Sequence, residues 1–178
     1  MKILALSGSL RAASVNTALL EAARRLAPAR IEVALYRDLA TLPAFNPDDD
    51  RDPPPSAAAA LRAEIGAADG LLVACPEYAH ALPGAFKNGL DWLVGSTEFP
   101  GKPVMLINAA PRAFHAQASL REILATMSAQ LVAESFVTVK APKEASVADL
   151  LADATIAGPL RAGLELFVSV LRAQQPRG

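Results

Sequence analysis

The chain has 178 residues and a single cysteine, which suits one domain and allows neither an internal disulfide nor a four-cysteine metal site. Its net charge of −1, with 52% hydrophobic and 20% charged residues, is typical of a globular protein and argues against a nucleic-acid partner. No apolar run approaches the roughly 20 residues that span a bilayer, and the run over 3–6 is too short for a signal peptide. We therefore expect a single cytoplasmic domain over residues 1–178, without a membrane partner.

Short apolar runs alternate with helical patterns along the chain. Residues 3–6 predict a buried strand that ends in a Ser-Gly-Ser loop. Ser14 can then cap a helix whose apolar residues recur up to Leu26, before Pro28. The next predictions are a strand over 31–36, an irregular segment over 37–56 with a solvated acidic run at 48–50, a helix over 56–67 and a strand over 71–74. The last are a helix over 85–94, a strand over 104–107, a helix over 117–129, a strand ending over 136–139 and a helical segment over 147–171 interrupted at 158–159.

The five predicted strands alternate with helices, and several strands are apolar throughout, as in a parallel sheet that is covered on both faces. We therefore predict an α/β fold with a doubly wound five-stranded parallel sheet of order 2-1-3-4-5 and helices on both faces. In this order strands 1 and 3 are neighbours, and a ligand crevice opens at their carboxyl ends. The loops that border this crevice are residues 7–14 and 76–84.

The loop over 7–14 places polar groups just before a helix N-terminus. Ser9 and Ser14 supply hydroxyls, Arg11 supplies a guanidinium, and Asn16 supplies an amide. Free N–H groups and the positive end of the helix dipole favour an anion there, and arginine matches phosphate oxygens. The loop lacks the lysine of a P-loop and the spaced glycines of a dinucleotide fingerprint, so we interpret it as a cradle for a mononucleotide phosphate. The alternative is that Ser14 only caps the helix and Arg11 lies in solvent.

The loop over 76–84 lies between two prolines and carries few reactive side chains. Glu77 and His80 could act as acid or base, or could be a solvent-facing carboxylate and a rim histidine. Tyr78 could pack on a ligand ring or belong to the core. The stiff backbone can present N–H and C=O groups to the edge of a flat heteroaromatic ring. Cys75 ends a buried strand, so we expect no nucleophilic role for it, and no metal constellation is visible.

Together the two loops resemble those of the NADPH-dependent FMN reductase family, which includes bacterial quinone, chromate and azo-dye reductases. The resemblance covers about residues 1–140 and rests on the order and spacing of two motifs. The chain departs from the family at Ala79, where asparagine is usual, and over 108–112, where serines and glycines are usual. The matching residues are Gly8, Ser9, Leu10, Arg11, Ser14 and Asn16, then Pro76, Glu77, Tyr78, Pro83, Gly84, Lys87, Asn88, Asp91 and Trp92.

The resemblance implies a flavodoxin-like fold with FMN as cofactor. It implies that the first loop holds the FMN phosphate, that the second borders the isoalloxazine ring, and that the matching residues at 87–92 are structural or interface residues. Arg112 and His115 become candidates for contacting the nicotinamide or the acceptor. The residues implied for FMN binding are Ser9, Leu10, Arg11, Ser14, Val15, Asn16, Pro76, Glu77, Tyr78, Ala79 and Ala109.

The resemblance also implies an enzyme that passes hydride from NADPH or NADH to FMN and then to a small acceptor. Quinones, chromate, azo compounds and free flavin are the acceptors that the family suggests. The cofactor carries this chemistry, so no catalytic acid–base pair is expected. We expect a homodimer or homotetramer. The alternatives are a flavodoxin-type FMN electron carrier, although such carriers are usually more acidic than this chain, and a non-enzymatic flavodoxin-like binding module.

Overall fold

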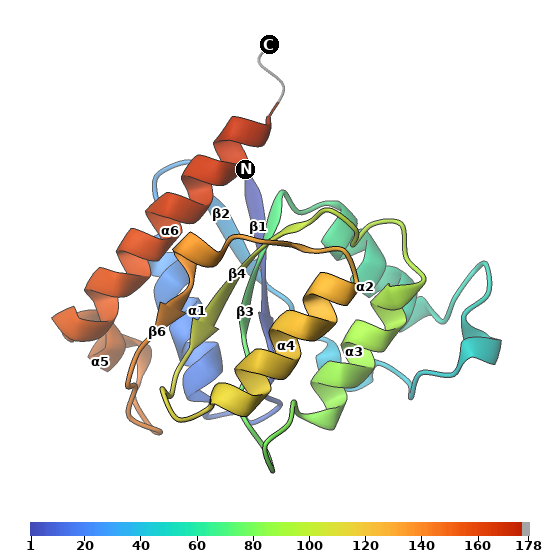
Figure 1. Cartoon of the computed structure of the whole chain (residues 1–178), viewed down its shortest axis with the longest axis horizontal. Helices are drawn as coiled ribbons and strands as arrows, with labels where there is room; N and C mark the ends of the chain where they lie inside the picture. Colours follow the sequence, from blue (N-terminus) through green and yellow to red (C-terminus); the bar gives the residue numbers. More distant parts are fainter. Residues whose placement is uncertain (176–178) are drawn as a thin grey trace.

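A computed structural model describes residues 1–175, in which a parallel β-sheet carries helices on both faces (Figure 1). β1 (Lys2–Ser7) pairs with β2 (Glu32–Leu35) on one side and with β3 (Gly70–Ala74) on the other, and β4 (Pro103–Asn108) pairs with β3. The strand order is β2-β1-β3-β4-β5, which confirms the predicted order 2-1-3-4-5. Residues 176–178 of the predicted domain lie outside the described part of the chain.

The fifth position of the sheet differs from the prediction of one strand. It consists of β5 (Gln130–Leu131) and β6 (Val137–Thr138), which pair with opposite ends of β4. A single 3₁₀ turn, η3 (Ala133–Ser135), separates them, and the Ser135 hydroxyl donates to the Val132 carbonyl over 2.7 Å. Because the Val132 carbonyl and the Ser135 hydroxyl bond to each other within the turn, the strand is interrupted there. The sheet therefore has six strands.

The core is divided into two layers because alternate residues of each strand point to opposite faces. Ile3 and Ala5 of β1 face one layer, and Leu4 and Leu6 face the other. The first layer is covered by α1 (Val15–Leu26), α5 (Val147–Ala152) and α6 (Ala154–Gln174), and the second by α2 (Ser56–Gly66), α3 (Gly84–Val94) and α4 (Phe114–Thr126) (Figure 1).

The C-terminal helical segment breaks at a different place from the one predicted. Asp153 separates α5 from α6, and its carboxylate accepts a hydrogen bond from the Thr155 N–H over 2.8 Å. The side chain thus caps a new helix, while Pro159 lies inside α6 without ending it. By length and composition alone α6 could cross a membrane, but Leu164 and Phe167 of its apolar face are fully buried against the sheet. We therefore ascribe its apolar character to the core.

The long irregular segment over 37–55 is held to the rest of the molecule by α3. The Asn88 side chain accepts from the Phe45 N–H over 2.7 Å, and the Trp92 indole donates to the Pro43 carbonyl over 2.8 Å. The two residues are therefore structural, as interpreted from the sequence. The segment contains the 3₁₀ turns η1 (Leu39–Thr41) and η2 (Pro47–Asp49). Its acidic run is only partly solvated, because Asp50 forms an ion pair with Arg62 at 2.7 Å.

Candidate functional site

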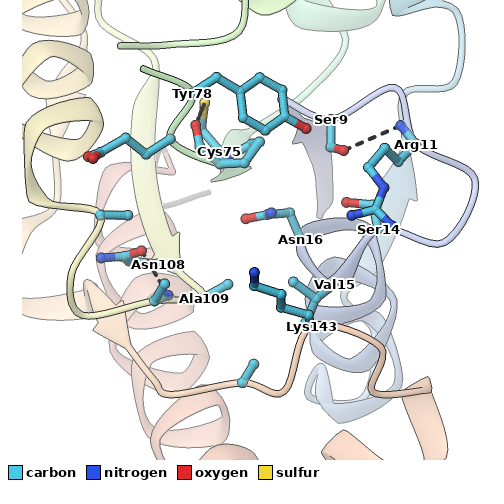
Figure 2. Close-up of a pocket in the computed structure, with 15 residues that line it drawn as sticks. Ser9, Arg11, Ser14, Val15, Asn16, Cys75, Tyr78, Asn108, Ala109 and Lys143 are labelled. Carbon is cyan, nitrogen blue, oxygen red and sulfur yellow. Dashed lines mark hydrogen bonds between the residues drawn. The ribbon is translucent and has the colours of Figure 1, made fainter. Parts of the chain in front are cut away.

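A pocket of about 300 Å³ opens at the carboxyl edge of the sheet, where the doubly wound order predicts a ligand crevice (Figure 2). Four chain segments contribute to it: the loops after β1, β3 and β4, and the segment that follows β6. Its volume lies at the lower end of the range for small-molecule sites. The lining residues are Ser9, Arg11, Ser14, Val15, Asn16, Cys75, Pro76, Glu77, Tyr78, Asn108, Ala109, Ala110, Ala113, Ala141 and Lys143.

The loop after β1 presents hydroxyl groups and the N-terminus of α1 to the pocket. Ser14 caps α1, its hydroxyl accepting from the Thr17 N–H at 3.4 Å, while Ser9 accepts from the Arg11 N–H at 3.3 Å. Since the first N–H groups of a helix have no partner within it, those of Val15 and Asn16 remain available to a ligand. Ser14 therefore caps the helix and lines the pocket at once, so the two interpretations of this serine are compatible.

Two cations flank the pocket without carboxylate partners. Arg11 lies in the loop after β1, and Lys143 reaches toward the Asn16 amide from the segment after β6 (Figure 2). Neither cation forms an ion pair with any residue in the described part of the chain. Together with the N-terminus of α1 they make this end of the pocket positive, which favours a phosphate.

Asn16 carries a buried acceptor that the protein leaves unsatisfied. Its side chain is directed into the pocket (Figure 2), only 5% of the residue is exposed, and Oδ1 has no hydrogen-bond partner within residues 1–175. A buried polar atom without a partner costs about 1–3 kcal/mol, so such atoms are rare in folded proteins. A ligand with a hydroxyl group beside its phosphate would satisfy this atom.

Glu77 joins the loop after β3 to the start of α4. Its carboxylate accepts a hydrogen bond from the Ala116 N–H over 2.9 Å, and Ala116 lies in the first turn of α4, where backbone donors lack intrahelical partners. Glu77 is thus neither a solvent-facing carboxylate nor a free base, but a cap supplied from another loop. This cap also accounts for the start of α4 at Phe114, three residues before the predicted start.

Replacing Glu77 with alanine is expected to lower the free energy of unfolding by about 1 kcal/mol, the usual effect of removing a helix cap. Glu77→Gln keeps a carbonyl oxygen that can accept the same bond and should retain most of the stability. Urea denaturation of both variants measures the difference. Equal losses in the two variants would show that the negative charge, and not the hydrogen bond, holds α4.

Residues 78–81 form a tight turn whose backbone is strained. Tyr78 and Ala81 exchange two backbone hydrogen bonds of 3.0 and 2.9 Å, and the central residues Ala79 and His80 both have positive φ, 49° and 60°. This is the geometry of a type I′ turn, which favours asparagine and glycine. Asparagine, which is usual at this position in the family that the two loops resemble, therefore suits the backbone better than Ala79 does.

We expect Ala79→Asn to raise the free energy of unfolding by up to about 1 kcal/mol, because asparagine tolerates the left-handed region better than alanine. The melting temperature should rise by about 2–4 °C per kcal/mol in a chain of this size. Ala79→Val serves as the opposite control, since a β-branched residue is disfavoured at positive φ. Differential scanning calorimetry measures both melting temperatures. A higher melting temperature for Ala79→Val than for Ala79→Asn would contradict the turn geometry.

Cys75 lines the pocket but is not poised for chemistry. It is 1% exposed, and burial raises the pKa of its thiol to about 12, so the sulfur stays protonated at neutral pH. This agrees with the expectation that it is no nucleophile. No group of three or more His, Cys, Asp or Glu side chains that could hold a metal ion occurs in residues 1–175.

Most of the residues predicted to bind a cofactor line one pocket, and the role itself stays a prediction. Leu10 and Ala79 are exposed outside the lining, as are Arg112 and His115. Tyr78 is 49% exposed at the pocket, so it is not a core residue. The residues predicted and found in the lining are Ser9, Arg11, Ser14, Val15, Asn16, Pro76, Glu77, Tyr78 and Ala109.

Lys143 is the charged residue of the pocket lining that sequence reasoning missed, beside Asn108 and three alanines, Ala110, Ala113 and Ala141. It follows β6, which pairs with the carboxyl end of β4, so its segment reaches the same edge of the sheet as the other loops. The predicted topology already placed the carboxyl end of the last strand at this edge. Lys143 could therefore have been predicted as a pocket residue if the segment after the last strand had been treated as a further binding loop.

Comparison with known proteins finds similar sequences and similar structures. The model of the NADPH-dependent FMN reductase family matches residues 1–143. An NAD(P)H-dependent FMN reductase of Pseudomonas aeruginosa is 38% identical over 129 residues, which cover 70% of this chain and 69% of the relative. A 2-hydroxy-1,4-benzoquinone reductase of a Burkholderia species is 35% identical over 146 residues, 79% of each chain. FerB, a flavoenzyme NAD(P)H:(acceptor) oxidoreductase from Paracoccus denitrificans, has a TM-score of 0.77 at 27% identity over 97% of both chains.

Proposed function

This chain belongs to the NADPH-dependent FMN reductase family, and from that premise we propose how its pocket holds FMN and which acceptors it serves. Its fold is flavodoxin-like, and it is an NAD(P)H-dependent, FMN-containing oxidoreductase that acts on small-molecule acceptors. We propose that the FMN phosphate lies between Arg11 and Lys143 at the N-terminus of α1. We also propose that the acceptor is a quinone, as in the Burkholderia relative.

The observation that carries the phosphate assignment is the convergence of unpaired cations, helix N–H groups and an orphaned amide at one end of the pocket. The positive charges of Arg11 and Lys143 can neutralise a phosphate dianion, and the N–H groups of Val15 and Asn16 can donate hydrogen bonds to it. The unsatisfied Oδ1 of Asn16 can accept from a ribityl hydroxyl beside the phosphate. The donor set and the orphaned acceptor therefore fit FMN.

The other end of the pocket suits a flat ring. Ala109, Ala110, Ala113 and Ala141 supply small apolar side chains, so a planar ligand can approach the backbone closely. The half-exposed Tyr78, which lies beside Ser9 in Figure 2, offers an aromatic face to the same pocket. These small residues would leave one face of the flavin ring accessible to a second planar molecule. The hydride donor and then the acceptor both need such access.

The protein acts in this reaction by binding and orientation. FMN, when bound, supplies hydride acceptance and the two-electron reduction of the acceptor. Glu77 is occupied as the cap of α4 and Cys75 stays protonated, so neither serves as a general base. Alignment of the nicotinamide or acceptor with the ring is then the main contribution of the chain.

Steady-state kinetics of the FMN-loaded protein test this function. With NADPH or NADH and a naphthoquinone as the varied substrates, we expect parallel lines in double-reciprocal plots, because the nicotinamide leaves before the acceptor binds. A flavodoxin-type carrier would take up FMN and show no turnover with either nicotinamide. A binding module would take up no FMN. Either result would contradict the proposed function.

We further propose that the protein works in the cytoplasm as a homodimer or homotetramer. The cytoplasm supplies the reduced nicotinamide, and the one cysteine is a buried free thiol. Light scattering coupled to size-exclusion chromatography of the FMN-loaded protein should give two or four times the chain mass of 18.6 kDa. A single-chain mass at micromolar concentration would contradict the oligomer.

A further inference from the structure

A column of stacked aromatic rings stands beside the pocket. The rings of His80 and His115 stack with centroids 4.3 Å apart and planes 24° apart, and Phe114 lies against His115 at 4.1 Å and 36°. Two rings cannot both stack at such distances on one face of an imidazole, so His115 lies between His80 and Phe114. We call these three residues the ring column.

The ring column adjoins the pocket through both of its chain segments. His80 follows the pocket residues Glu77 and Tyr78, and Phe114 directly follows the pocket residue Ala113. The hydrogen bond from the Ala116 N–H to Glu77 ties the two segments together at this point. The three rings are outside the pocket lining itself, and their backbone continues two of the segments that form it.

The backbone holds His80 in this position against its conformational preference. The residue has φ of 60° at the centre of the turn over 78–81, where a residue other than glycine costs about 1–2 kcal/mol. Strained residues of this kind concentrate at ligand sites, where the surrounding structure maintains them. A solvent-facing turn without a binding role would gain stability from glycine at this position.

The outer end of the ring column is open to solvent. Phe114 is 61% exposed, although it is a large apolar residue that the core does not use. Aromatic rings stack on one another with about 0.5–1.5 kcal/mol beyond the area that they bury. The column thus offers a flat apolar face next to the ring end of the pocket, with imidazole N–H groups that can donate to carbonyl oxygens.

We propose that the ring column is the binding surface for a planar aromatic acceptor of the quinone class. This inference rests on the proposed function and adds the residues that select the acceptor. The acceptor stacks against the rings and directs a carbonyl oxygen to an imidazole N–H, which places it beside the ring end of the pocket. A non-planar acceptor gains no stacking energy from the ring column.

Comparing two acceptors in Phe114→Leu tests the assignment, since leucine keeps an apolar side chain and removes the ring. The KM for a planar naphthoquinone should rise about two- to tenfold, the equivalent of one lost stacking contact. The KM for ferricyanide, an octahedral acceptor that cannot stack on a ring, should rise by a smaller factor than the KM for the quinone. Leu166→Ala, a 46% exposed apolar residue on α6, is the matched control and should leave both KM values as in the wild type.

A second variant separates stacking from hydrogen bonding. His115→Phe keeps three stacked rings and removes the N–H donor, so the planar acceptor should lose less affinity than in His115→Ala. Unchanged quinone KM in Phe114→Leu and His115→Ala, or equal rises for quinone and ferricyanide, would overturn the inference. A wild-type protein whose flavin is not reduced by NADPH or NADH would instead overturn the proposed function.

Discussion

Arg11→Ala is expected to weaken FMN binding by about tenfold to a hundredfold, the effect of losing one charged hydrogen bond to phosphate. The affinity for riboflavin, which lacks the phosphate, should stay as in the wild type. Arg11 makes no ion pair within residues 1–175, so its removal leaves no carboxylate unpaired and stability should hardly change. Quenching of flavin fluorescence by the apoprotein measures both affinities.

Lys143 extends this test to the opposite wall of the pocket. Lys143→Ala should also weaken FMN binding but not riboflavin binding, by less than Arg11→Ala because lysine offers no planar fork to the phosphate. Arg25→Ala, an exposed arginine of α1 away from the pocket lining, is the control for a loss of positive charge alone. If Arg11→Ala and Arg25→Ala bind FMN equally well, the phosphate does not lie at this end of the pocket.

Gly8→Ala is expected to reduce both stability and FMN affinity, because the two main loops of the site meet at this residue. A Cβ at Gly8 would lie 2.6 Å from the Cys75 sulfur and 3.2 Å from the Cys75 Cα, while the Gly8 N–H donates to the Ala74 carbonyl over 2.8 Å. The methyl group forces the loops after β1 and β3 apart. Overpacking of this kind costs about 1–3 kcal/mol.

The double variant Gly8→Ala, Cys75→Ala shows whether this clash is the cause. It removes the sulfur that the new methyl group meets first, so part of the lost stability and FMN affinity should return. Urea denaturation and FMN titration of the two single variants and the double variant provide a full cycle. Losses that simply add, with no recovery in the double variant, would contradict a close contact between the two loops.

The order of the strands and the location of the crevice could be predicted from the sequence because they depend on local patterns. Continuous apolar runs mark buried parallel strands, and the polar loop over 7–14 follows the first of them. The cap at Ser14 was equally local, since a capping side chain bonds to a backbone group in the next turn. Such features need no knowledge of distant contacts.

The features that escaped prediction depend on contacts between distant residues. Glu77 caps a helix through Ala116, and His80 stacks on His115, in each case across more than thirty positions of sequence. The division of the C-terminal helix is the exception, because Asp153 caps α6 through Thr155, only two positions on, and this local signal was overlooked. Nothing local in the sequence distinguishes Glu77 as a cap from Glu77 as a free carboxylate.

The visible spectrum of the protein during one reaction cycle shows directly whether bound FMN takes hydride from a nicotinamide and passes it to an acceptor. The protein, loaded with FMN and freed of unbound flavin under anaerobic conditions, should show the oxidised flavin band. Adding NADPH or NADH should bleach that band at the rate of a catalytic turnover, and adding a naphthoquinone should restore it without oxygen. A protein that retains no flavin, or a flavin band that neither nicotinamide bleaches, would show that the chain does not catalyse this reaction.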